Sequence, residues 1–166
     1  WFERGTKETG VPVLRMAFPL ALKDAKACYE IPFGSIDYEM SHAEEVPALQ
    51  WAKVTGEADN KKHAGCLLIN DCKHGHSLDG NILRLTLIRS SYEPDLLPEI
   101  MEHEIHLALQ PFTNEMPASE SIHLGRSFNH ALRVVSTDIH SGVLPVNAEL
   151  ITVTPASIVM SALKKA

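Results

Sequence analysis

The residues best suited to chemistry lie together in one polar segment, 70–81. Carboxylate and imidazole side chains are the types that ligate metal cations, and the segment contains four of them: Asp71, His74, His76 and Asp79. It separates two strongly apolar runs, and long ordered loops between strands are often functional. The same composition also fits a solvated hairpin loop, in which Asn, Asp and Gly satisfy turn geometry. Spacing alone leaves both interpretations open.

Other patterns give little support for catalysis by this chain. His103-Glu104-Ile105-His106 resembles a zinc-protease motif but is one residue too short. The local alternation is that of a strand, where a spacing of three places His103 and His106 on opposite faces. The chain has no Gly-x-Ser-x-Gly elbow, glycine-rich phosphate loop or cysteine-centred signature. These patterns therefore indicate no catalytic residue, and they add no metal site to the one left open in the polar segment.

The elements that must position the polar segment are predicted to be strands. Apolar and other residues alternate with period two, which is typical of strands with one buried face. The alternating runs are residues 14–18, 27–31, 36–40, 51–54, 83–87, 105–109 and 158–162. Residues 65–69 are apolar throughout, which indicates a strand covered on both faces.

Turn residues separate these runs and no β-α-β unit is apparent, so we predict an all-β antiparallel sandwich. We expect at most one short helix, N-capped by Ser119 or Ser121 and carrying Ile122, Leu124 and Phe128. Residues 110–121 contain two prolines and are predicted to be a surface loop. We treat residues 1–166 as a single domain, and the start at Trp1 suggests a piece of a longer polypeptide.

Composition excludes several classes of function. Of the 166 residues, 15 are Lys or Arg and 21 are Asp or Glu, so the net charge of −6 argues against nucleic acid and anionic membranes as partners. No apolar run is long enough to span a bilayer. Three cysteines do not make a disulfide framework, and with the absence of Asn-x-Ser/Thr sequons they favour a cytoplasmic location.

Six segments, in order along the chain, resemble glycoside hydrolase family 38 α-mannosidases. Residues 29–36 (YEIPFGSI) are similar to the family's "YEIPFGxIER", and residues 67–76 (LLINDCKHGH) to its "LLNDxKYGY". The other matching segments are residues 45–52, 81–90, 103–109 and 159–166. The motifs belong to the C-terminal β-sandwich region of that family.

The resemblance implies that the chain is a non-catalytic part of a retaining α-mannosidase. It implies a partner on the same polypeptide, an N-terminal catalytic domain with a zinc ion and an Asp nucleophile, for which this chain has no counterpart. It also implies that a loop reaches the rim of the mannoside site. The candidate rim residues are Asn70, Asp71, Lys73, His74 and His76. His74 and His76 replace two family tyrosines, which would make the loop sensitive to pH.

Two alternatives come from other functional classes. A free-standing carbohydrate-binding module would present aromatic side chains to sugar faces, although only 6% of the residues are aromatic. A small metal-binding protein would use the histidines of the polar segment. A domain separated from its catalytic partner would also expose an apolar patch, which leaves a homo-oligomer open.

Overall fold

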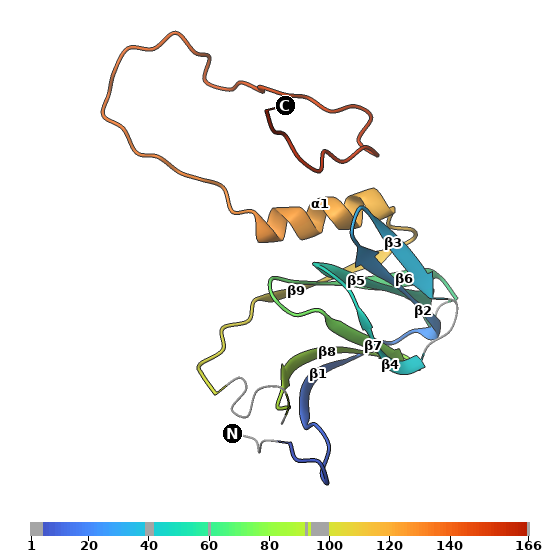
Figure 1. The fold of residues 1–166 in the computed structure, drawn as a ribbon. Helices are drawn as coiled ribbons and strands as arrows, with labels where there is room; N and C mark the ends of the chain where they lie inside the picture. Colours follow the sequence, from blue (N-terminus) through green and yellow to red (C-terminus); the bar gives the residue numbers. More distant parts are fainter. Residues whose placement is uncertain (1–4, 39–41, 60, 92, 94–99, 166) are drawn as a thin grey trace.

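A computed structural model describes residues 5–38, 42–59, 61–91, 93 and 100–165. These residues form nine strands and one helix (Figure 1). The strands are β1 (Val13–Pro19), β2 (Lys23–Ile31), β3 (Gly34–Tyr38), β4 (His42–Pro47), β5 (Trp51–Glu57), β6 (His63–Asn70), β7 (Gly75–Asp79), β8 (Ile82–Arg89) and β9 (Leu107–Thr113). The helix is α1 (Ala118–Asn129).

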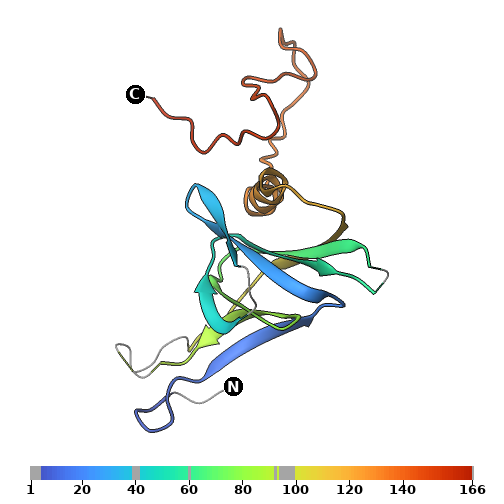
Figure 2. The same cartoon turned by 90° about the vertical axis from the view of Figure 1, so that its right-hand side faces the viewer.

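The strands form two antiparallel sheets. One sheet has the order β1-β8-β7-β4 and the other the order β3-β2-β5-β6-β9. The helix lies beyond the five-stranded sheet, on the side away from the four-stranded sheet, and residues 131–165 extend from its end without forming a strand (Figures 1 and 2). This arrangement confirms the predicted all-β antiparallel sandwich with one short helix.

The main core lies between the two sheets. In β5, Ala52 and Val54 face this core and are fully buried. In the neighbouring strand β6, Leu68 also packs there, against Leu83 and Leu85 of the opposite sheet. Successive side chains of a strand point to opposite faces, so the residues between these contribute to a second core.

The second core fills the space between the five-stranded sheet and the helix. Trp51, Leu67 and Ile69 of the sheet form it with Met116, and Ile122 and Leu124 of the helix pack against it. A Cβ atom added to Gly125 would lie 3.0 Å from Trp51 Cδ1, so glycine here lets the helix approach the indole closely. The run 65–69 is therefore covered on both faces, as predicted.

The predicted helix exists, but its start differs from the prediction. It begins after Pro117, which has extended backbone angles and makes no side-chain capping bond, rather than after Ser119 or Ser121. Ser121 is instead buried inside the first turns. Proline before the first turn costs no hydrogen bond there, because the first N–H groups of a helix have no partner within it.

Three sequence-based predictions of local structure were wrong. The segment 70–81 is not one loop, because residues 75–79 form β7 between β8 and β4. The segment 110–121 is not a surface loop, because β9 runs to Thr113 and the helix begins at Ala118. Residues 158–162 alternate like a strand but form none, and within the described residues no strand pairs with them. Residues 39 and 40, predicted to continue a strand, lie outside the described residues.

The hairpin between β2 and β3 turns on Pro32 and Phe33. Phe33 has a φ of +64°, in the left-handed region that favours Gly and Asn. Its side chain is 96% exposed, so no burial offsets this conformation. The turn thus holds a bulky aromatic residue at a position where the backbone disfavours it.

We expect Phe33→Asn to raise the free energy of unfolding by roughly 1 kcal/mol, because Asn tolerates the left-handed conformation better than Phe. Urea unfolding of the two proteins measures the difference. Phe33→Ala is the matched control, since it removes the ring but keeps a Cβ atom in the same conformation. A gain of the same size in Phe33→Ala would show that the exposed ring, not the backbone, is responsible.

Candidate functional site

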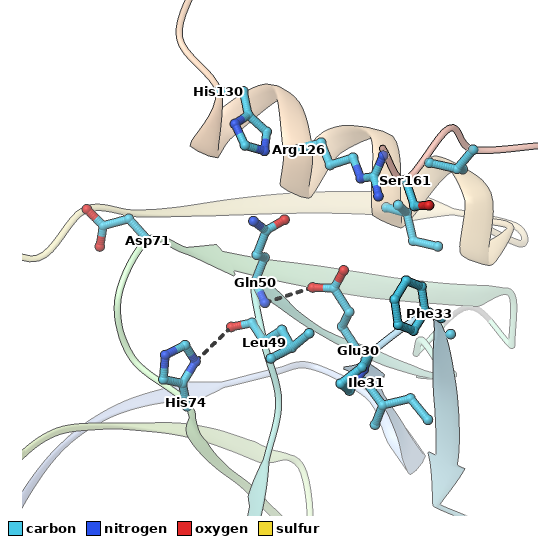
Figure 3. A pocket seen from close by; sticks show the side chains of 14 residues that line it. Glu30, Ile31, Phe33, Leu49, Gln50, Asp71, His74, Arg126, His130 and Ser161 are labelled. Carbon is cyan, nitrogen blue, oxygen red and sulfur yellow. Dashed lines mark hydrogen bonds between the residues drawn. The ribbon is translucent and has the colours of Figure 1, made fainter. Parts of the chain in front are cut away.

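A groove of about 700 Å³ lies between the helix and the end of the β2–β3 hairpin (Figure 3). Glu30 and Phe33 come from the hairpin, Gln50 directly precedes β5, and Arg126 comes from the helix. The corner that follows β6 closes one end of the groove with Asp71 and His74. The helix forms one wall together with Val159 and Ser161 of the segment that follows it, and the sheet forms the other.

Glu30 is the half-buried carboxylate of the groove. It accepts a hydrogen bond of 2.7 Å from the backbone N–H of Gln50. Burial raises the pKa of the Glu30 carboxyl, while that N–H and the charge of Arg126 oppose the rise. The indole N–H of Trp51 also lowers this pKa, although it does not reach the geometry of a hydrogen bond. Burial therefore favours the protonated form of Glu30, whereas Gln50 and Arg126 favour its ionised form.

Asp71 at the end of the groove is paired with His106. Their Oδ2 and Nδ1 atoms are 2.7 Å apart, and the backbone N–H of His106 donates to Oδ1 at 3.3 Å. The Cys72 side chain and then His106 lower the pKa of Asp71, while Asp71 raises the pKa of His106. Both side chains are solvent-accessible, so the pair orients the Asp71 carboxylate rather than contributing much stability.

The other residues of this corner differ in their burial and in their contacts. Asn70 is buried, and its Oδ1 accepts the backbone N–H groups of Cys72 at 3.2 Å and Lys73 at 2.7 Å. His74 is exposed, and its Nδ1 lies 3.2 Å from the carbonyl oxygen of Ala48. The half-buried Lys73 follows the turn that Asn70 stabilises but does not line the groove. The structure thus brings Asp71 and His74, of the five predicted rim residues, into the groove.

His76 lies between the two sheets instead. Its ring is 1% exposed and its centroid is 6.1 Å from that of Tyr29. Burial lowers the pKa of His76 to about 4. The expectation that His76 responds to neutral pH is therefore wrong, because its imidazole stays uncharged until the medium is strongly acidic.

The sequence did not indicate that several residues of the groove would meet in one site. Glu30 and Gln50 precede a predicted turn and strand, and Arg126 lies on a helix predicted only from capping and apolar spacing. Glu30 and Gln50 are brought together where β2 and β5 pair, and Arg126 joins them because the helix packs over that sheet. No local pattern marks these residues as a site, because the site forms only when the fold brings them close together.

Across the described residues, no three side chains of His, Cys, Asp or Glu come close enough to hold a metal ion. The three cysteines are free thiols, of which Cys28 and Cys66 are buried and Cys72 is exposed. The described residues also contain no helix that is long and apolar enough to span a membrane.

The two antiparallel sheets with their helix define a β-sandwich, and comparison with known proteins identifies its family. Residues 6–96 match the family described as glycosyl hydrolases family 38 C-terminal domain. The match covers more than half of the 166 residues, so the chain belongs to this family.

The curated relatives that the chain matches are α-mannosidases. The chain is 31% identical over 127 residues to α-mannosidase of Saccharomyces cerevisiae and 32% identical over 124 residues to α-mannosidase 2C1 of Homo sapiens. Each match covers 72% of this chain but only 11% and 12% of those proteins. α-Mannosidase G of Dictyostelium discoideum is 26% identical over 93% of this chain and 14% of its own length. The chain therefore spans a small part of the relatives it matches.

The buried His76 predicts an acid-sensitive fold. The pKa of His76 is lower in the folded than in the unfolded chain. The contribution of His76 to the free energy of unfolding is therefore fully present above about pH 6.5 and is lost as the pH falls toward about 4. The free energy of unfolding of the unsubstituted chain should fall by roughly 3 kcal/mol over this pH interval. His76→Tyr introduces the residue of the family motif, which does not titrate here, so this variant should not show that fall. Urea unfolding at several pH values measures it.

Tyr29→Phe is the matched control for this experiment. It changes the ring beside His76 but keeps the imidazole, so its pH dependence should follow the unsubstituted chain. Equal pH dependence in His76→Tyr and the unsubstituted chain would contradict the prediction.

Proposed function

We propose that this chain is the non-catalytic C-terminal sandwich of a retaining α-mannosidase and packs on the catalytic domain of the same polypeptide. The observation that carries the proposal is the family match, together with relatives that are α-mannosidases some eight times longer than the aligned region. The reaction is hydrolysis of terminal α-mannosides, and the two carboxyl groups that attack the anomeric carbon and protonate the leaving oxygen belong to the other domain.

Zinc has no part in the proposed role of this chain. The family resemblance implies a zinc ion in the catalytic domain, but the described residues here gather no set of three ligands. The same finding gives the metal-binding alternative no geometric support. A cytoplasmic location is part of the proposal, supported by three cysteines that remain free thiols.

The proposed contact with the mannoside site is the corner after β6. Asn70 holds the backbone of this corner in a turn, which leaves Asp71, Lys73 and His74 outside the two cores. Ammonium and imidazole groups can hydrogen-bond the hydroxyls of a sugar, and a carboxylate held by His106 can accept from them. Asn70 and His76 are buried, so in this proposal they support the corner rather than contact substrate.

We expect the isolated chain to release no phenol from an aryl α-mannoside, with or without added zinc or cobalt. The full-length polypeptide that contains it should hydrolyse the same compound. Release by the pure chain would overturn the non-catalytic assignment, and an inactive full-length polypeptide would overturn the α-mannosidase assignment.

The rim contact has its own test in the full-length enzyme. Lys73→Ala should raise KM about tenfold with a smaller change in kcat, since it removes a binding contact and no reacting group. Lys61→Ala, in the exposed turn between β5 and β6, is the matched control. If both substitutions leave KM unchanged, Lys73 does not contribute to the rim.

A further inference from the structure

The exposed ring of Phe33 is the starting observation. This side chain is 96% exposed at a left-handed turn position where Phe is disfavoured. Residues held in sparsely populated conformations concentrate at binding and active sites, where the surrounding structure maintains them. Here the flanking strands β2 and β3 fix the turn, because Ile31 pairs with Gly34 on either side of it. The structure thus presents an aromatic face to solvent at a conformational cost.

The ring lies at the edge of the groove, not on open surface. Figure 3 shows Phe33 beside Glu30, with the Arg126 side chain extending from the helix above them. The groove volume of about 700 Å³ lies within the range of roughly 300–1,000 Å³ that is usual for small-ligand sites. An apolar face and polar groups therefore meet in a space large enough for a sugar ring.

The polar groups of the groove suit a neutral ligand. Glu30 carries a negative charge that the nearby Arg126 offsets, since the guanidinium stabilises the ionised carboxylate. The Gln50 backbone N–H uses one acceptor position of Glu30, and a carboxylate has about four. Arg126 donates to the carbonyl oxygen of Met160 and has five N–H donors in all. Donors and acceptors thus remain for a ligand that has both, such as a polyol.

We propose that this groove binds one pyranose ring of a neutral α-mannoside, with Phe33 against the C–H face of the ring and Glu30, Gln50 and Arg126 on its hydroxyls. The identity of the sugar as mannose rests on the proposed function, whereas the existence of a ligand site is inferred from the geometry of the groove. It is distinct from the corner at Asp71 because its aromatic and its charged pair lie at the hairpin end of the groove (Figure 3).

Titration of the isotopically labelled chain with methyl α-mannoside, followed by amide chemical shifts, tests the proposal. We expect a dissociation constant on the order of 1 mM, because the groove is open and encloses only part of a ring. The amide shifts should centre on residues 30, 31, 33, 34 and 50. Cellobiose, titrated in parallel, distinguishes a mannoside site from a general pyranoside site and should bind at least about tenfold more weakly.

Three variants locate the site. Phe33→Asn should stay folded and weaken binding about tenfold, as expected for loss of a central aromatic contact. Phe33→Trp should bind about as well as the unsubstituted chain, because it keeps an aromatic face at this position. Phe128→Ala is the matched control, since Phe128 is also exposed but does not line the groove.

Each outcome supports or overturns the inference. Absence of shifts with methyl α-mannoside, or equal binding by Phe33→Asn and the unsubstituted chain, would overturn it. If Phe33→Asn instead lowers only the thermal stability of the full-length enzyme, the ring contacts the catalytic domain and the sugar site is also overturned. Hydrolysis of aryl α-mannoside by the full-length enzyme would leave the proposed function standing in either case.

Discussion

Strand β6 carries apolar side chains on both of its faces, and the rest of the architecture depends on covering both. Leu67 and Leu68 are adjacent and therefore point in opposite directions, yet both are fully buried. Burying such a side chain contributes about 1.5–3 kcal/mol, so a single covering layer would lose much of this energy. The four-stranded sheet covers one face and the helix covers the other.

The groove is a consequence of this second covering layer. A helix over the outer face of the five-stranded sheet contacts its central strands, and Gly125 lets it approach Trp51 closely. The β2–β3 hairpin projects beyond that contact, so helix and hairpin enclose a space between them (Figure 3). Glu30 and Arg126 face this space from opposite elements. The same packing that buries the apolar residues therefore also assembles the polar ones.

The corner after β6 shows how two similar substitutions reach different environments. His74 and His76 both replace a tyrosine of the family motif, and they are two residues apart in the sequence. His74 remains exposed and contacts the Ala48 carbonyl oxygen, whereas His76 is enclosed between the sheets beside Tyr29. Between them the chain enters β7, which pairs on both sides. Strand formation at Gly75 thus separates a surface histidine from a core histidine.

Much of the fold could be predicted from the sequence because it depends on local patterns. Period-two alternation and the apolar run 65–69 indicate strands and the faces they bury, and ordered motifs indicate the family. These signals reside in neighbouring residues, so no contact distant in sequence is needed to recognise them. The polar corner at Asp71 was found in the same way, through its motif.

The remainder was decided by tertiary structure. Residues 75–79 are rich in turn formers but become β7 because strands on both sides pair with them, whereas residues 158–162 alternate like a strand and form none. A strand needs a neighbour to satisfy its backbone, and no local pattern specifies that neighbour. Glu30 and Arg126, some hundred residues apart, share a groove for the same kind of reason, since helix packing alone brings them near each other. The sequence by itself therefore determined which residues are apolar and where strands can form, while contacts between distant segments decided which strands pair and which polar groups meet.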